Sequence, residues 1–120
     1  MGGEKSRRGV ARVSEAAVQA YVRSCFAQQA VPRVSELAET LGVSRGTLIK
    51  QVKRLMGTTP GAYLKAEQLT RAKRFLLRGW SIERAARTAG YATKRTFYRS
   101  FQEATGTTPA AFRERERNVI

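Results

Sequence analysis

The sequence predicts an all-α fold of seven helices, arranged as two similar subdomains joined by a long shared helix. The first observation is an internal repeat, in which residues 34–65 match residues 82–113 and GTTP occurs in both copies. The second is that apolar residues recur at spacings of three and four, the period of an amphipathic helix. Because two copies are too few for a solenoid, we expect each copy to form its own small subdomain.

Serine residues at regular places divide the first half into helices. Ser14 is placed to cap a helix over about 15–28. The expected buried stripe of this helix consists of Val18, Tyr21, Val22 and Cys25. Ser35 is expected to cap a short second helix that ends at Gly42. The expected inward residues of this second helix are Leu37, Ala38 and Leu41.

A third helix follows after a turn of only Gly-Val-Ser. Ser44 is expected to cap it, and it covers about 45–56, where Gly57 ends it. Its expected buried side consists of Leu48, Val52, Leu55 and Met56. A helix, a tight turn containing Gly and a second helix together form the DNA-binding helix-turn-helix unit.

A long fourth helix begins at Thr59 and Pro60 and runs to about Arg78, with a broad apolar face suited to serving both halves. The second half then repeats the first. Ser81 is expected to cap a fifth helix that ends at Gly90, and Thr93 a sixth over about 94–105. The sixth should bury Phe97, Phe101 and Ala104. A seventh short helix, opened by Thr108 and Pro109 and anchored by Phe112, runs to about Arg117.

The chain therefore divides into four expected parts. They are a disordered basic arm over 1–13, a first helix-turn-helix subdomain over 14–58, a linker helix over 59–79 and a second helix-turn-helix subdomain over 80–118.

The charge indicates a polyanionic partner. Lys and Arg number 23 against 9 acidic residues, all of them Glu, which gives a net charge of +14 and a pI near 11.2. Double-stranded DNA is the first candidate and an anionic membrane surface the second. No apolar run approaches the roughly 18 residues of a membrane span, and no signal peptide is visible. We therefore expect no membrane partner and a cytoplasmic location at the nucleoid.

The residue inventory argues against catalysis. His and Asp are absent, which removes the usual general base, most metal ligands and any Ser-His-Asp arrangement. The single cysteine, Cys25, lies at core spacing and has no internal disulfide partner. We expect no catalytic residue, no metal site, no cofactor and no enzyme activity.

Two helix faces carry the residues expected to contact DNA. On the third helix these are Arg45, Gly46, Thr47, Ile49, Lys50, Lys53 and Arg54. On the sixth they are Lys94, Arg95, Thr96, Tyr98, Arg99 and Gln102. Arg can bind guanine O6 and N7 with two hydrogen bonds, and Thr or Ile can touch a thymine methyl. Residues in the first two turns reach bases most readily, whereas later ones such as Lys53 more often meet phosphate.

The sequence resembles the double helix-turn-helix domain of AraC/XylS-type bacterial transcription regulators over residues 14–115. The most specific match is the segment GYATKRTFYRSFQEATGTTPAAFR that ends at residue 113. The resemblance implies seven helices in two subdomains, binding to two successive major-groove segments on one DNA face, and promoter control through contact with RNA polymerase. Gly46 departs from the family, in which a large contacting side chain often stands at this position.

We therefore expect a sequence-specific transcription regulator. The usual sensor or dimerisation domain is missing from this sequence, so we expect a monomer on DNA unless such a domain lies outside it. One alternative is the end-binding module of a transposase or recombinase, since those enzymes also use paired helix-turn-helix units. The other is a sequence-blind architectural DNA binder or membrane-surface binder. Competition between a specific fragment and bulk DNA separates these possibilities.

Overall fold

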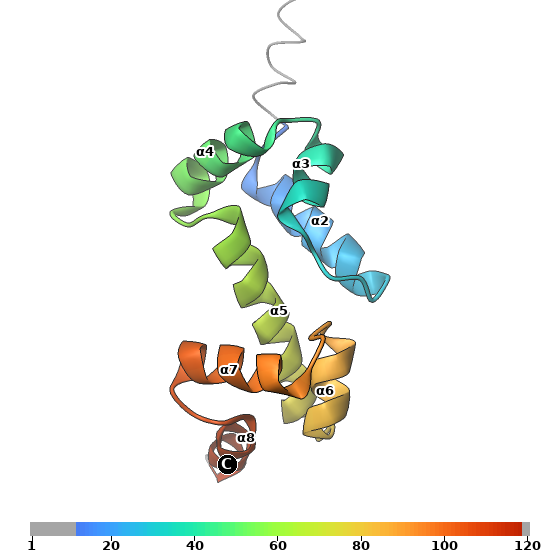
Figure 1. The fold of residues 1–120 in the computed structure, drawn as a ribbon, viewed down its shortest axis with the longest axis vertical. Helices are drawn as coiled ribbons and strands as arrows, with labels where there is room; N and C mark the ends of the chain where they lie inside the picture. The colour runs from blue at the N-terminus through green and yellow to red at the C-terminus, as the bar shows by residue number, and fades with distance from the viewer. Residues whose placement is uncertain (1–11, 119–120) are drawn as a thin grey trace, which may run out of the picture. The chain divides into compact units, whose positions relative to one another are not determined.

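The computed structural model describes residues 12–118, and within that range the chain forms seven α-helices and no strands (Figure 1). The helices are α2 (Glu15–Ala27), α3 (Val34–Leu41), α4 (Arg45–Met56), α5 (Pro60–Leu77), α6 (Ile82–Thr88), α7 (Lys94–Thr105) and α8 (Pro109–Asn118). The expected all-α fold is confirmed. The chain divides into two compact units, residues 1–65 and 66–120, and the boundary lies within α5.

Hydroxyl caps begin six of these helices as the sequence predicted. Each cap oxygen accepts a hydrogen bond from a backbone N–H three residues later, at 3.0–3.2 Å. The capping residues are Ser14, Ser44, Thr59, Ser81, Thr93 and Thr108. Such caps satisfy backbone donors that have no partner inside the helix, and they fix where each helix starts.

The prediction that Ser35 caps the second helix is wrong. Helix α3 begins one residue earlier, at Val34, and its N-cap Arg33 makes no side-chain capping bond. The hydroxyl of Tyr21, which reaches over from α2, instead accepts from the backbone N–H of Arg33 at 2.9 Å and donates to Glu36 Oε1 at 2.7 Å. Burial raises the pKa of Tyr21 well above its usual value, so this hydroxyl keeps its proton and remains a donor.

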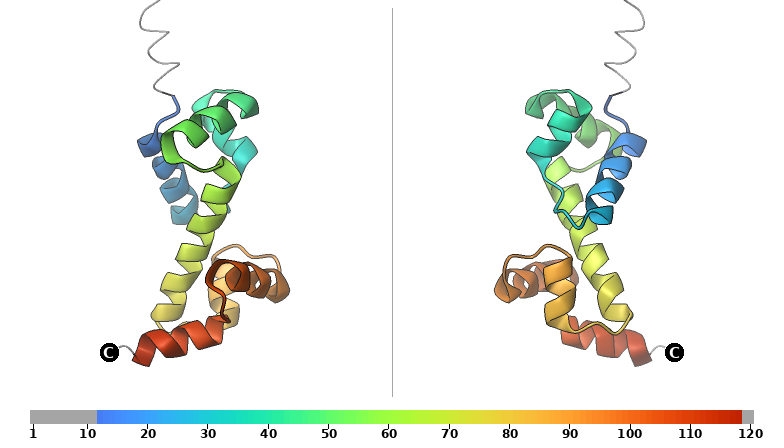
Figure 2. Two further views of the ribbon diagram at one scale, coloured as in Figure 1. Left: turned by 90° about the vertical axis from the view of Figure 1, so that its left-hand side faces the viewer. Right: turned by 90° about the vertical axis from the view of Figure 1, so that its right-hand side faces the viewer.

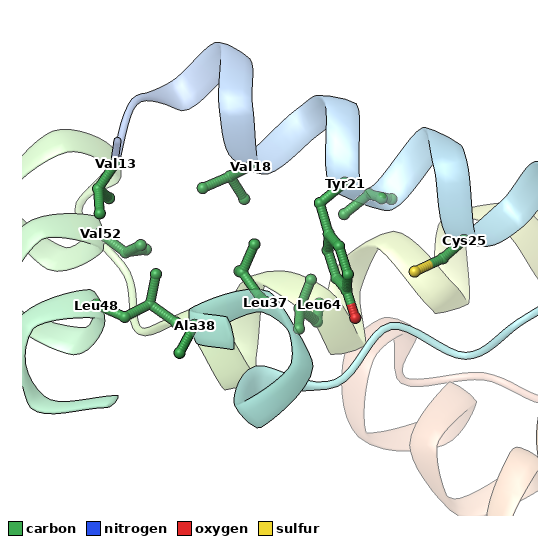
Figure 3. Packing of buried hydrophobic residues seen from close by; sticks show 10 residues of the cluster. Val13, Val18, Tyr21, Cys25, Leu37, Ala38, Leu48, Val52 and Leu64 are labelled. Carbon is green, nitrogen blue, oxygen red and sulfur yellow. The ribbon is translucent and has the colours of Figure 1, made fainter. Parts of the chain in front are cut away.

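The core of the first unit gathers side chains from α2, α3, α4 and the start of α5 (Figure 3). Its buried members are Val13, Val18, Tyr21, Val22, Cys25, Leu37, Ala38, Leu48, Val52 and Leu64. The predicted stripe on α2 is confirmed, and Cys25 is a buried free cysteine of that core. The small Ala38 lies where α3 meets α4, which lets the two helices pack closely.

The predicted basic arm over 1–13 needs a correction at its end. Residues 1–11 lie outside the described part of the chain. Val13, however, is a core residue with only 3% of its surface exposed, because the residue just before the α2 cap packs against the same cluster. Arg12 next to it donates from Nη1 to the carbonyl of Gly42 at 2.9 Å.

The core of the second unit is richer in aromatic side chains. Its buried members are Leu69, Ala72, Phe75, Leu76, Ala85, Ala86, Ala89, Phe97 and Phe101. The Trp80 ring stacks on Phe75 with centroids 4.2 Å apart. Phe112 meets Phe101 edge-on at 5.3 Å, so it anchors α8 as predicted.

Two expected core residues are exposed instead. Leu55 is 45% exposed, and Ala104 is also exposed. They occupy the same place in the repeat, three residues after Val52 and Phe101, which are fully buried. A step of three residues along a helix advances about 300°, so these side chains fall on a flank of the buried stripe, in the last turn of each helix.

Candidate nucleic-acid interface

A tight turn positions α4 against α3. Gly42 adopts the left-handed conformation, with φ of 69°, which an L side chain rarely adopts. The next backbone N–H, of Val43, bonds to the carbonyl of Ala38 at 3.0 Å. Leu48 and Val52 are completely buried and hold one side of α4 on the core. The opposite side is therefore presented outward, as the sequence predicted (Figure 2).

The outer side of α4 is basic and largely uncovered. Its exposed residues are Arg45, Gly46, Ile49, Lys50, Lys53 and Arg54. Thr47 is only half-buried, and its Oγ1 accepts from the Ser44 hydroxyl at 3.0 Å. This bond fixes the Thr47 side chain at the start of the helix.

Helix α7 is positioned in the same way in the second unit. The left-handed residue here is Gly90, with φ of 97°, and the N–H of Tyr91 bonds to the carbonyl of Ala86 at 3.0 Å. Phe97 and Phe101 have no exposed surface and anchor the helix. The exposed residues of its outer side are Lys94, Arg95, Thr96, Arg99 and Gln102.

Tyr98 differs from the other predicted contact residues of α7. It is half-buried and packs against the core cluster of the second unit. Its ring meets Phe97 edge-on at 6.2 Å, and the ammonium of Lys94 lies 5.9 Å from its centroid. Much of this ring is therefore engaged within the protein.

The basic residues on the outer sides of α4 and α7 have no acidic partner in the described part of the chain. Within residues 12–118, none of the basic residues of α4 and α7 forms a salt bridge with a carboxylate. Their charge is therefore not neutralised internally and can pair with an external polyanion. The same range contains no cluster of three potential metal ligands and no helix that is long and apolar enough to cross a membrane.

Three side chains that support the turns could not be predicted from the sequence. The first is Arg12, which donates to the carbonyl of Gly42. Gln68 donates to the carbonyl of Ala89 at 3.0 Å, and Arg71 donates to the carbonyl of Thr88 at 3.2 Å. Each bond holds a carbonyl at the end of the helix that precedes α4 or α7. The partners lie 17 to 30 residues apart in sequence, so no local pattern reveals them.

Comparison with known proteins adds independent information. The family model described as "Helix-turn-helix domain" matches residues 37–115. The Xylose operon regulatory protein of Escherichia coli K12 is 32% identical over 89 residues, which cover 73% of this chain and 23% of that protein. The chain thus corresponds to about a quarter of the length of these curated relatives.

Two solved structures are similar as well. The xylose-binding transcription activator xylR aligns with a TM-score of 0.71 and 28% identity, over 85% of this chain and 27% of that one. The DNA-binding domain of AdpA, solved with a target DNA, aligns with a TM-score of 0.74 and 23% identity, over 84% of this chain and 93% of that one. The likeness to AdpA concerns the fold alone.

Proposed function

This chain belongs to the AraC/XylS-type helix-turn-helix family, whose members are DNA-binding transcription regulators, and on that premise we propose that it binds double-stranded DNA sequence-specifically through α4 and α7. The observation that carries the proposal is the pair of matching basic helix faces, each anchored by fully buried side chains and neither paired with a carboxylate of residues 12–118. Each helix enters a segment of the major groove, which is wide enough to admit one.

The side chains of the two helices divide between bases and phosphates. Arg95 and Arg99 lie in the first two turns of α7, on its exposed side, where guanidinium groups can each donate two hydrogen bonds to guanine. Lys53 and Arg54 lie near the end of α4, where phosphate contact is the more accessible role. The remaining proposed contacts are Arg45, Gly46, Thr47, Ile49, Lys50, Lys94, Thr96, Tyr98 and Gln102.

The biological setting of this proposal is transcription at bacterial promoters. The chain acts in the cytoplasm at the nucleoid, binds DNA as a monomer through its two units, and influences initiation by touching RNA polymerase. Support comes from relatives that are named as operon regulators and transcription activators. No cofactor takes part in DNA binding by these two faces.

Selection of bound fragments from the source genome, followed by affinity measurements, tests the proposal. The best fragment should bind at least about 10³-fold more tightly than random duplex at one fixed salt concentration. It should also lie upstream of a gene whose transcription changes when the protein is removed. Equal binding to all duplexes would identify an architectural binder, and recovery of the ends of mobile elements would identify a recombination protein.

A further inference from the structure

Ile49 is an exposed apolar residue in the middle of the basic face of α4. Its side chain is 40% exposed, although isoleucine is β-branched and gains nothing from an exposed helix position. Residues three and four apart are neighbours on a helix surface, which places Arg45, Gly46 and Lys53 around it. Ile49 therefore lies inside the surface that is expected to meet DNA.

Gly46 leaves the space beside Ile49 open. A Cβ placed on Gly46 would meet no atom within 4 Å. Side chains on a helix lean toward its N-terminus, so Ile49 leans over the turn that contains this glycine. The absence of a side chain there allows the backbone of α4 to approach a partner closely, and Ile49 approaches with it.

The major groove offers this side chain one apolar partner. Its floor presents hydrogen-bond donors and acceptors, and the C5-methyl group of thymine is the single apolar group among them. We infer that Ile49 contacts a thymine methyl in the half of the DNA site bound by α4, an inference that rests on the proposed function. Arg45 on one side of Ile49 and Lys50 and Lys53 on the other hold the flanking phosphates and bases by charge.

The second unit lacks an equivalent contact. In the repeat, Tyr98 occupies the place of Ile49, and Arg95 occupies that of Gly46. Tyr98 is held against Phe97 and Lys94, as described above, and a long guanidinium side chain fills the place of the open glycine. The methyl contact inferred for Ile49 therefore has no counterpart at the equivalent position of α7.

Replacement of thymine by 2′-deoxyuridine tests the inference, because it removes the methyl group and keeps every hydrogen-bonding group. Each thymine of the best selected duplex is replaced in turn, and Kd is measured by fluorescence anisotropy for the wild-type protein and for Ile49→Ala. At one position the wild type should lose about fourfold in affinity, the value for burial of one methyl-sized group. Ile49→Ala should bind the thymine and deoxyuridine duplexes equally at that position.

Leu55→Ala is the matched control. Leu55 lies on the same helix, is 45% exposed, and stands about 120° around the helix from Ile49. This variant should keep the full fourfold sensitivity, and circular dichroism should show all three proteins equally helical. The inference is overturned if no thymine replacement changes the Kd of the wild-type protein. It is also overturned if Ile49→Ala loses as much affinity as the wild type at the sensitive position. Loss of all preference for the selected duplex over random DNA would instead overturn the proposed function.

Discussion

At the scale of single residues, the Tyr21 hydroxyl takes the place of the helix cap that the local sequence predicts at Ser35. Ser35 matches the usual pattern of a helix start, yet the Tyr21 hydroxyl bonds the backbone of Arg33 and the carboxylate of Glu36 at the entrance to α3. The sequence separation between Tyr21 and these partners is 12 and 15 residues. A capping rule that looks three residues ahead cannot detect such a contact.

Tyr21→Phe should therefore destabilise the protein more than Ser35→Ala. The phenylalanine ring fills the same space but leaves the Arg33 N–H without its partner, which should lower the free energy of unfolding by about 1–2 kcal/mol. Ser35→Ala should change it by less than about 0.5 kcal/mol, because no helix cap is lost. Urea denaturation measures both variants. The reverse order would show that Ser35 is the effective cap.

Cys25 supplies a second prediction at this scale. It is 5% exposed, and its Sγ lies 4.0 Å from Glu36 Oε1. Cys25→Ser should lower the free energy of unfolding by about 1–2 kcal/mol, because it places a more polar group in the core. DNA sequence preference should be unchanged, since Cys25 is a buried residue of α2 and is not among the proposed DNA contacts. Chemical denaturation and competition binding on the same samples check the two statements, with exposed Ser24→Ala as control.

At the scale of helices, the sequence predicts well where each helix lies. It predicts less well which side chains at the edge of a buried stripe are exposed. Caps and glycine stops are local signals, so the start of α4 at Arg45 and of α7 at Lys94 could be read directly. Burial depends on what lies opposite each side chain. Leu55 and Ala104 carry apolar side chains at a plausible spacing, but no helix among the described residues covers the last turn of their helices on that flank. The candidate site was predictable because it is the side opposite the buried stripe.

Helices α4 and α7 should contribute differently to DNA binding. Arg99 can read guanine through two parallel hydrogen bonds, whereas lysine is a point charge with weaker geometric demands. Arg99→Ala should cost about 1–3 kcal/mol on the best site and far less on random DNA. Lys53→Ala should weaken binding to both duplexes by similar amounts and reduce the salt slope by roughly 1.

Titrations of both variants on specific and random duplexes at several salt concentrations check this assignment. Glu103→Gln on α7 is a useful control, because it alters the charge of the same helix by one unit without removing a proposed contact. Equal weakening of both duplexes by Arg99→Ala, together with loss of preference in Lys50→Ala, would reverse the roles of the two helices.

At the scale of the whole molecule, charge should dominate affinity. The exposed cations of the two faces are Arg45, Lys50, Lys53, Arg54, Lys94, Arg95 and Arg99. Neutralising phosphates releases counterions, so log K should fall steeply with log salt, with a slope that corresponds to about 5–8 phosphates. Binding isotherms between low and moderate salt measure the slope. A slope near zero on duplex DNA would remove nucleic acid as the main partner.

Each unit carries one of the two proposed DNA-binding helices, and this predicts the length and symmetry of the DNA site. A monomer should protect a bipartite, non-palindromic site of about 16–22 base pairs. The reason is that α4 and α7 each occupy a major-groove segment, and successive segments are about 10 base pairs apart. Footprinting, with the molecular mass of the complex measured by light scattering, checks both the length and the stoichiometry. Protection of a palindrome by dimers alone would argue against this arrangement.

The division of α5 between the two units has a consequence for how the protein can be dissected. Leu64 belongs to the first core and Leu69 to the second, so one uninterrupted helix completes both. A truncated gene that stops at Gly57 deprives the first core of Leu64, and one that starts at Trp80 deprives the second of four buried residues, Leu69, Ala72, Phe75 and Leu76. The repeat visible in the sequence, residues 34–65 and 82–113, therefore does not mark two modules that could be exchanged by recombination. The first copy lacks the core residues supplied by α2, and the second lacks those supplied by the end of α5.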